Sequence, residues 1–401
     1  MSLPVTLHRQ LPTVKKLLLQ TQPWRPGSSA VASLATNKEQ RQHRLSVFLA
    51  EQERQRSAKT ATTEAAIEVS TAEKLSKSVS LKLNAASTPL DVAKQLDEAA
   101  QDGGGGNLVR DSALAVVDEQ YYWSMRRPLK KSCLLRFIPL MRGSPASRQE
   151  AVDMKAGNNA LWRSGAMLLG SVFETAFKEE YRVQLVSSPP PHFSTGSFVY
   201  DCRVTKDQAL QHSVLQLTGG HCLSAWAPSR AELRALSRAA LPLLSADAPF
   251  EWLELPLPVA LDMFKHNPFK LAAAKRAASA SAAAAHSVSG PQRQQQPAAS
   301  VAVYKVGDFV DLLGQGPLLS RTGQIASLLF AAVHRIESAD YGSLARVQGI
   351  ATAAGMSPAE VADWADAALE KASELNSTFP PSEQPQIGAA ASKPAAAAAA
   401  R

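Results

Sequence analysis

Short apolar runs separated by polar breaks divide the first part of the chain into strands and one helix. Between residues 64 and 142 the pattern predicts strands at 66–70, 79–84, 113–117 and 134–140, with a helix at 88–100. Thr88 before Pro89 gives that helix an N-cap and a proline at its first position. The order of elements predicts a small β-grasp sheet packed on one helix, an α+β arrangement.

The pattern continues through a second α+β domain, predicted at 151–352. It opens with a helix at 157–177, whose apolar residues recur at helical spacing, and a helix follows at 259–266. Strands are expected at 181–186, 196–203, 249–254, 301–306 and 346–351. Ser229 and Ser357 each precede a glutamate by three residues, the capping-box spacing that opens a helix. The second of these begins a helix predicted at 356–377.

Low-complexity composition sets the remaining boundaries. Residues 272–300 are rich in Ala, Ser and Gln, which predicts a disordered insertion between two strands of the second domain. Residues 378–401 form a Pro/Ala tail that is expected to be disordered. No stretch approaches the length of a membrane span, so no membrane-spanning helix is expected.

The net charge of +8 comes almost wholly from the N-terminus. Residues 1–60 hold four Lys and six Arg against three Glu, a local charge of +7, and no acid precedes Glu39. Residues 1–36 therefore have the acid-free, basic, amphipathic composition of an organelle transit peptide. The mitochondrial matrix is the first choice of compartment. A plastid, or an unrelated basic tail, is the alternative.

Cysteine usage excludes two classes of small module. The three cysteines are an odd number without a C-x-x-C pair, so neither a disulfide framework nor a zinc module is indicated. His221 and Cys222 are adjacent, and two neighbours cannot complete a tetrahedral site. A turn entering a strand is the preferred interpretation of that pair.

Two basic clusters are candidates for RNA contact. Residues 37–63 form a basic N-terminal extension with a short helix, and a cationic turn follows the aromatic run 121–123. The candidate residues are Arg41, Arg44, Arg54 and Arg56 in the helix and Arg126, Arg127, Lys130 and Lys131 in the turn. The alternatives are a solvated helix and an ordinary solvated turn whose aromatic residues lie in the sheet core.

Residues 160–167 and 307–318 resemble the two halves of the editing domain of threonyl-tRNA synthetase. That family carries His-x-x-x-His in the first segment and Cys-x-Gly-Pro-His in the second. Here the four positions hold Arg163, Met167, Gly314 and Leu318, which cannot bind metal or move protons as imidazole and thiolate do. We therefore expect no catalytic residue, metal or cofactor. Met167 is expected to fill the core, and Arg163 to face the surface or RNA.

Asp308 and Asp311 are the one carboxylate pair that could have replaced the lost site. Paired carboxylates can serve acid/base or Mg²⁺ chemistry. Their spacing on a strand points them to opposite faces, so a structural role at the strand end is preferred.

A second resemblance covers the first domain. Residues 88–93, 115–118 and 127–135 are similar to the ubiquitin-like TGS domain that precedes the editing domain in threonyl-tRNA synthetases. Together, a TGS-like domain, a ligand-stripped editing-like domain and a basic leader resemble the synthetase-like proteins of the mitochondrial large ribosomal subunit, over about residues 64–352.

That resemblance implies a structural, non-catalytic ribosomal protein. Its partners would be mitochondrial large-subunit rRNA and neighbouring mitoribosomal proteins, without a small-molecule substrate, and the helix at 356–377 would dock on one of those proteins through its apolar side. Two alternatives stay open. One is a free-standing deacylase of mischarged tRNA, and the other is an RNA-binding module outside the ribosome.

Overall fold

The computed structural model describes most of the two predicted domains and the helices that flank them. The described residues are 36–60, 66–71, 80–84, 87–99, 107–140, 145–178, 180–191, 195–206, 228–286, 299–314, 316–353 and 357–371. All of them lie in one compact unit, Ala35–Arg401. The predicted leader up to residue 35, the pair His221 and Cys222, and the tail at 378–401 fall outside the described residues.

The first sheet has five strands in the order β2-β1-β5-β3-β4. They are β1 (Ala66–Thr71), β2 (Ser80–Asn84), β3 (Ser112–Val117), β4 (Tyr121–Trp123) and β5 (Cys133–Pro139). Strands β1 and β5 pair in parallel, and the other neighbours pair antiparallel. The four predicted strands are therefore confirmed, and β4 is an addition. Short helix α3 (Leu108–Asp111) precedes β3.

Helix α2 (Pro89–Ala99) packs beside this sheet and starts where its cap predicts. The Thr88 hydroxyl accepts a hydrogen bond from the Asp91 N–H, and the Asp91 carboxylate accepts one from the Thr88 N–H. This reciprocal arrangement satisfies two amides that the first helical turn leaves open. Val92 and Ala93 are fully buried in a core shared with the sheet.

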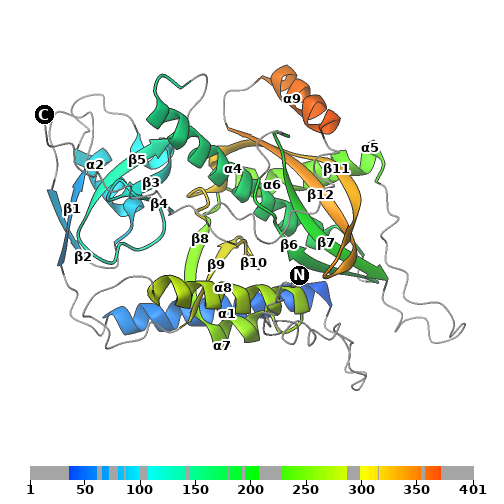
Figure 1. The fold of residues 1–401 in the computed structure, drawn as a ribbon, viewed down its shortest axis with the longest axis horizontal. Helices are drawn as coiled ribbons and strands as arrows, with labels where there is room; N and C mark the ends of the chain where they lie inside the picture. Colours follow the sequence, from blue (N-terminus) through cyan, green and yellow to red (C-terminus); the bar gives the residue numbers. More distant parts are fainter. Residues whose placement is uncertain are drawn as a thin grey trace, which may run out of the picture. The chain divides into compact units, whose positions relative to one another are not determined.

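The second sheet has four antiparallel strands in the order β11-β12-β7-β6. They are β6 (Tyr181–Ser187), β7 (Phe198–Lys206), β11 (Ile325–Ser338) and β12 (Gly342–Ala353). The long helix α4 (Arg148–Thr175) runs across this sheet, and the two short helices α5 (Arg230–Ala239) and α6 (Leu241–Ser245) lie next to β11 (Figure 1).

Glycines let α4 approach the sheet closely. A Cβ at Gly165 would lie 2.5 Å from the ring of Phe198, and one at Gly170 would lie 2.9 Å from the ring of Tyr200. Helix α4 begins at Arg148, earlier than the apolar pattern predicted, because Ser147 caps it through the Glu150 N–H. The helix and sheet share the largest core cluster of the described residues.

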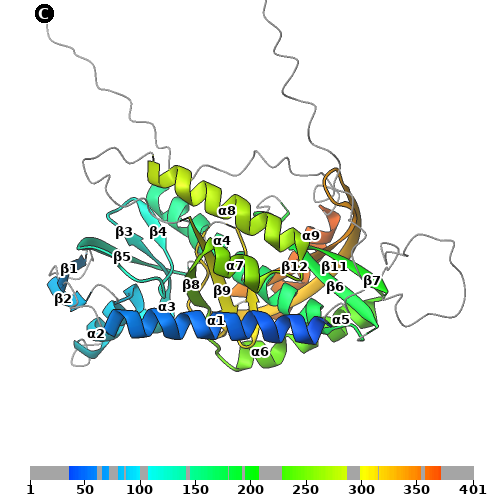
Figure 2. The same ribbon diagram turned by 90° about the horizontal axis from the view of Figure 1, so that it is seen from below.

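The third sheet has the order β10-β9-β8, with β8 (Glu251–Pro256), β9 (Ser300–Val306) and β10 (Phe309–Asp311). Helices α1 (Asn37–Thr60), α7 (Leu257–Met263) and α8 (Pro268–His286) lie beside it, as Figures 1 and 2 both show. Phe48 of α1 is fully buried in the core that these elements share. The basic N-terminal helix is therefore part of the folded body.

Helix α8 corrects the expectation of a disordered insertion at 272–300. Residues 272–286 are helical, and residues 287–298 lie outside the described part of the chain. Alanine has the highest helix propensity, so an Ala-rich run forms a helix once a few of its residues find a surface to cover. Ala274 and Ala278 supply that contact, because both are buried in the core with α1, β8 and β9.

Helix α9 (Pro358–Glu370) starts at the predicted capping box of Ser357 and Glu360. Its apolar side packs on the protein's own sheet. This corrects the expectation that the apolar side docks on a neighbouring protein. The indole Nε1 of Trp364 donates to the Gly196 carbonyl at 2.7 Å, and its ring meets Trp162 edge-on at 6.3 Å. The outward face carries acidic side chains, since Glu360, Asp363, Asp366 and Glu370 are all exposed.

Candidate functional site

The two editing-like segments meet between α4 and the chain that follows β10. Arg163 on α4 donates from its guanidinium to the carbonyls of Leu313 and Gly316. The next residue, Ser164, accepts a hydrogen bond from the Leu319 N–H at 2.9 Å. The structure therefore brings together the segments that the sequence paired.

Arg163 is buried, with 9% of its surface exposed, which corrects the expectation that it faces solvent or RNA. Gly316 has φ +118°, and the carbonyls of Leu313 and Gly316 point toward α4. Buried carbonyls need donors, and a guanidinium supplies several from one side chain. Burial lowers the pKa of Arg163. The side chain fills the space between helix and loop.

The other editing-like positions are equally unsuited to chemistry. Met167 and Leu318 are both fully buried in the main core, which confirms Met167 as core filling. Gly314 takes a left-handed conformation with φ +56°, which favours glycine at this turn. Within the described ranges, no group of three or more His, Cys, Asp or Glu side chains is placed to hold a metal ion.

A buried polar cluster lies next to this filled site and was not predicted. Lys270 of α8 reaches the Asp311 carboxylate of β10 at 2.8 Å, the Tyr200 hydroxyl of β7 at 2.8 Å and the Leu312 carbonyl at 3.1 Å. The Tyr200 hydroxyl also donates to Asp311. Each of the three residues is no more than 2% exposed.

Burial lowers the pKa of Lys270 and raises that of Tyr200 well above its usual value. A lowered lysine pKa is a feature of some catalytic sites, but here the ammonium group already makes three protein contacts. The cluster therefore joins three elements rather than offering a free base. Sequence reasoning had considered only Asp311, since Lys270 and Tyr200 carry no motif of their own.

A second buried charge cluster holds α1 against α4. Arg44 donates to both Glu174 carboxylate oxygens at 2.7 and 2.6 Å and to the Val310 carbonyl at 3.0 Å. Arg41 pairs with Glu174 at 3.3 Å and with Asp308 at 2.6 Å. Asp308 and Asp311 thus have separate partners and do not converge, although Asp308 lies in the turn before β10 rather than on the strand.

The buried positions of Arg41 and Arg44 correct the expectation that both contact RNA. Their side chains are only 10% and 7% exposed. Glu174 is the physical reason, because a carboxylate that is 4% exposed is stable only when cations compensate its charge. Sequence reasoning missed Glu174, which lies more than 100 residues away along the chain.

The other two arginines of α1 are exposed. Arg54 pairs with Glu51 at 2.6 Å, and Arg56 pairs with Glu53 at 2.9 Å, each three residues back along the helix. These are the contacts of an ordinary solvated helix face. Their contact with RNA stays a prediction.

The cationic turn after β4 is built into the contact with the third sheet. The Arg127 guanidinium lies 3.7 Å from the Trp123 ring and 5.0 Å from the Trp252 ring. Arg126 donates from Nε to the Ser320 carbonyl at 2.7 Å. Burial lowers the pKa of both arginines. Cation–π stacking therefore uses these aromatic residues within the fold.

The two lysines of the turn are exposed and paired. Lys130 lies 3.1 Å from Glu254, and Lys131 lies 3.3 Å from Asp118. Exposed pairs of this kind contribute little to stability and leave the ammonium groups accessible. Contact of these two lysines with RNA also stays a prediction.

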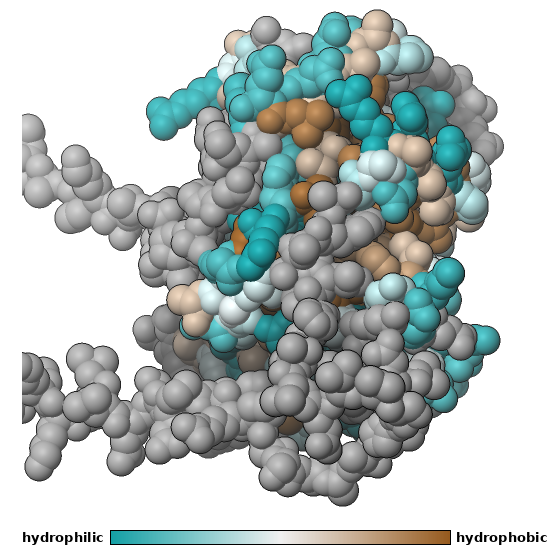
Figure 3. Space-filling view, turned by 90° about the vertical axis from the view of Figure 1, so that its right-hand side faces the viewer, coloured by the Kyte–Doolittle hydropathy of each residue, from teal (hydrophilic) through white to brown (hydrophobic). Residues whose placement is uncertain are grey.

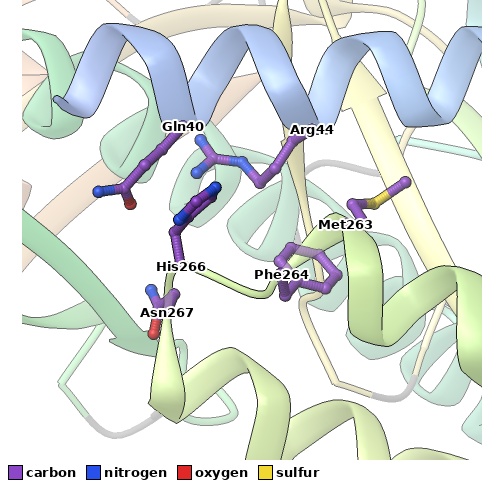
Figure 4. A pocket seen from close by; sticks show the side chains of 6 residues that line it. All are labelled: Gln40, Arg44, Met263, Phe264, His266 and Asn267. Carbon is purple, nitrogen blue, oxygen red and sulfur yellow. The ribbon is translucent and has the colours of Figure 1, made fainter. Parts of the chain in front are cut away.

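A shallow pocket lies between α1 and the link from α7 to α8 (Figure 4). Its lining residues are Gln40, Arg44, Met263, Phe264, His266 and Asn267. The His266 ring packs edge-on against His43 at 5.6 Å, and burial lowers its pKa.

Asn267 caps the start of α8 next to this pocket. Its carboxamide oxygen accepts from the Phe269 and Lys270 N–H groups, while its Nδ2 donates to the Leu185 carbonyl. The pocket therefore holds no arrangement of acid, base and nucleophile.

Comparison with known proteins identifies a ribosomal protein among the similar sequences. The chain is 30% identical over 270 residues to the large ribosomal subunit protein mL39 of Drosophila melanogaster, an alignment that covers 67% of this chain and 66% of that protein. This chain is related to mL39. No protein-family model matches the chain.

More distant similarity extends to threonine–tRNA ligases. The mitochondrial threonine–tRNA ligase 1 of Arabidopsis thaliana is 25% identical over 266 residues, which are 66% of this chain and 28% of the ligase. The mitochondrial threonine–tRNA ligase of Homo sapiens is 25% identical over 241 residues, 60% of this chain and 24% of the ligase. The chain thus spans just under two thirds of mL39 and about a quarter of each ligase.

The structure contains no candidate membrane span among the described helices, since none combines sufficient length with sufficient hydropathy. The longest of them, α4, is interrupted by charged and polar residues and packs on a sheet.

Proposed function

We propose that the protein is a structural, non-catalytic constituent of the mitochondrial large ribosomal subunit. The observation that carries the proposal is the 30% identity to mL39 over 270 residues. Its partners would be the large-subunit rRNA and neighbouring mitoribosomal proteins, in the mitochondrial matrix. The basic leader composition, with no acid before Glu39, favours that compartment.

The geometry supports the absence of catalysis. Hydrolysis of an aminoacyl ester needs a group that activates water or binds a metal, with room for the substrate beside it. Arg163 fills the space between α4 and the loop, and Met167 and Leu318 are sealed in the core. The editing-like domain at 151–352 would then serve as a folded surface.

Strand order supports a TGS-like β-grasp domain at 64–142. A β-grasp sheet places its first and last strands side by side in parallel at the centre, with a helix packed across it. Strands β1 and β5 pair in this way, and α2 packs on the same sheet. The two domains would follow each other in the order found in threonyl-tRNA synthetases.

Sedimentation of a mitochondrial lysate through a density gradient tests the proposal. We expect the protein in the large-subunit peak and in the assembled ribosome. Recovery in a light, soluble fraction would support an RNA-binding module outside the ribosome and would overturn the proposal.

The ligase similarity makes deacylation the second function to test. Purified protein incubated with seryl-tRNA of threonine specificity should release no serine above the uncatalysed rate. Release above that background would identify an editing enzyme, and the buried Lys270 and Tyr200 would then need to become accessible to the substrate.

A further inference from the structure

Helix α5 presents three arginines that the fold itself does not use. Arg230, Arg234 and Arg238 are exposed, and in the described part of the chain none has a side-chain hydrogen bond or ion pair. By contrast, the cations predicted to bind RNA all have partners within the protein. The three arginines are therefore the cationic group most available to an external anion.

Their spacing places them in one stripe. Residues four apart on an α-helix lie about 6 Å apart along the axis and about 40° apart around it, so all three guanidinium groups leave the same side. Like charges at this spacing repel and destabilise an isolated helix. The arrangement costs stability unless an anion lies across it.

Helix α5, which carries the three arginines, is held in place by contacts with the main core and with β11. Leu236 is buried in the main core, and the Ser237 hydroxyl accepts the Phe330 N–H of β11 at 2.9 Å. Glu232, the one acid of the helix, binds the N–H and hydroxyl of Ser229 at its own N-terminus. It lies about 160° around the helix from Arg234, so it does not neutralise the stripe.

The exposed residues between the arginines favour a polynucleotide over a lipid surface. They are Ala231, Glu232 and Ala235. The two alanines are too small to anchor a helix in a membrane, and Glu232 lies on the other side of the helix from the arginines. Small side chains also allow a phosphate backbone to approach closely. Figure 3 shows the side of the molecule on which α5 lies in Figure 1, and hydrophilic residues project from its described surface.

We infer that the stripe formed by Arg230, Arg234 and Arg238 binds the phosphate backbone of RNA. Guanidinium groups form paired hydrogen bonds with phosphate oxygens, and a cationic stripe attracts a polyanion. The inference rests on the proposed ribosomal function and names the surface that would face rRNA.

The test removes the three charges from the full chain and measures binding to polyuridylate over a series of salt concentrations. The variant is Arg230→Gln, Arg234→Gln and Arg238→Gln, because glutamine keeps the helix propensity. The matched control removes three other exposed arginines that are not candidates for RNA contact, with Arg148→Gln, Arg276→Gln and Arg335→Gln.

We expect the α5 variant to bind at least about tenfold more weakly and its log–log salt slope to fall by about 2, while the control changes much less. A loss in the control equal to that in the α5 variant would overturn the inference. So would unchanged binding by the α5 variant.

Two further measurements serve as controls, one for misfolding of the variant and one for binding to other anionic partners. A triple Arg→Lys variant of the same positions should keep most of the salt slope, which excludes misfolding as the cause. Binding to phosphatidylserine vesicles and to polyglutamate should not depend on the stripe. If either binding is lost in the α5 variant while polyuridylate binding is kept, the partner is a membrane or an acidic protein and the inference fails.

Sedimentation separates this inference from the proposed function. If the unaltered protein sediments with the large subunit but the α5 variant binds RNA as well as it does, the ribosomal proposal stands and only the inference about the stripe is refuted.

Discussion

At the scale of single residues, cations of this basic protein serve two different purposes. Arg41 and Arg44 neutralise a carboxylate inside the fold, whereas Arg234 has no partner among the residues that the structure describes. Residue type does not distinguish them, since all three are arginines on amphipathic helices. The position of Glu174, a buried carboxylate on another helix, decides which of them are structural.

Removing that carboxylate should destabilise the protein strongly. Glu174→Gln would leave the buried Arg44 guanidinium without a compensating charge and Arg41 with Asp308 alone. We expect the free energy of unfolding to fall by about 3 kcal/mol. Urea denaturation followed by circular dichroism measures this. Glu370→Gln, on the exposed face of α9, is the control and should change stability by less than about 0.5 kcal/mol. Equal effects of the two substitutions would contradict the role of Glu174.

Asp308 should make the stability depend on pH. A hydrogen bond from Arg41 holds the pKa of this carboxyl below its ordinary value of 3.8. A depressed pKa in the folded state contributes stability above the unfolded value, and that contribution is lost as the pH falls through the folded pKa. The stability difference between the native protein and Asp308→Asn should therefore shrink below pH 3.8. Urea titrations from neutral pH to about pH 3 follow it, and a constant difference would count against this ion pair.

At the scale of elements, helix boundaries follow local chemistry while helix partners do not. Ser229 and Ser357 open α5 and α9 where their capping boxes predict, because the cap and its glutamate lie within one turn. The apolar side of α9 was expected to meet another protein, yet it meets Trp162 and Gly196 of its own chain. A capping motif says where a helix begins and nothing about what the helix covers.

Helix α8 offers a matched pair of substitutions. Ala278 is 1% exposed, whereas Ala280, two residues on, is exposed. Ala278→Asp would bury an unpaired charge and should lower the free energy of unfolding by about 3 kcal/mol. Ala280→Asp should cost less than about 1 kcal/mol, the difference in helix propensity. Similar small effects at both positions would mean that α8 does not pack on the core as described.

At the scale of the whole molecule, α1 completes two parts of the fold. It closes the core around Phe48 and it neutralises Glu174 beneath the second sheet. The N-terminal extension, predicted to be an RNA-binding arm, is thus a component of the folded body. Any leader peptide that is removed must leave Arg41 in place.

Two deletions test this integration. A variant without Asn37–Thr60 should lose cooperative unfolding, because it exposes the core around Phe48 and leaves Glu174 unpaired. A variant without residues 1–35 should unfold at the temperature of the full chain, since the arginine pairs of α1 begin at Arg41. Thermal denaturation monitored by circular dichroism compares them. Cooperative melting of the first variant would show that α1 is dispensable.

Much of the fold could be predicted because many of its strands and helix starts depend on residues that are close together in the sequence. The strands around Val116 and Val303 follow from apolar runs, and the start of α2 follows from Thr88 and Pro89. The site could be predicted only in part. The apolar residues around Met167 were sufficient to predict that it lies in the core. Arg163 was predicted to be exposed, because the loop carbonyls that it binds could not be identified from the sequence.

The sequence by itself determined the α+β class, the boundaries of β1, β6 and β9 to within one residue, and the loss of the metal-type residues at four positions. It predicted neither β11 nor the start of α4. The tertiary structure alone decided that Arg163, Arg41 and Arg44 are internal, that Lys270 joins Tyr200 to Asp311, and that the α5 arginines are available. The reason is the range of the interactions. Periodicity and capping act within a turn or a strand, but the partner of a buried charge lies elsewhere in the chain, and only folding places it.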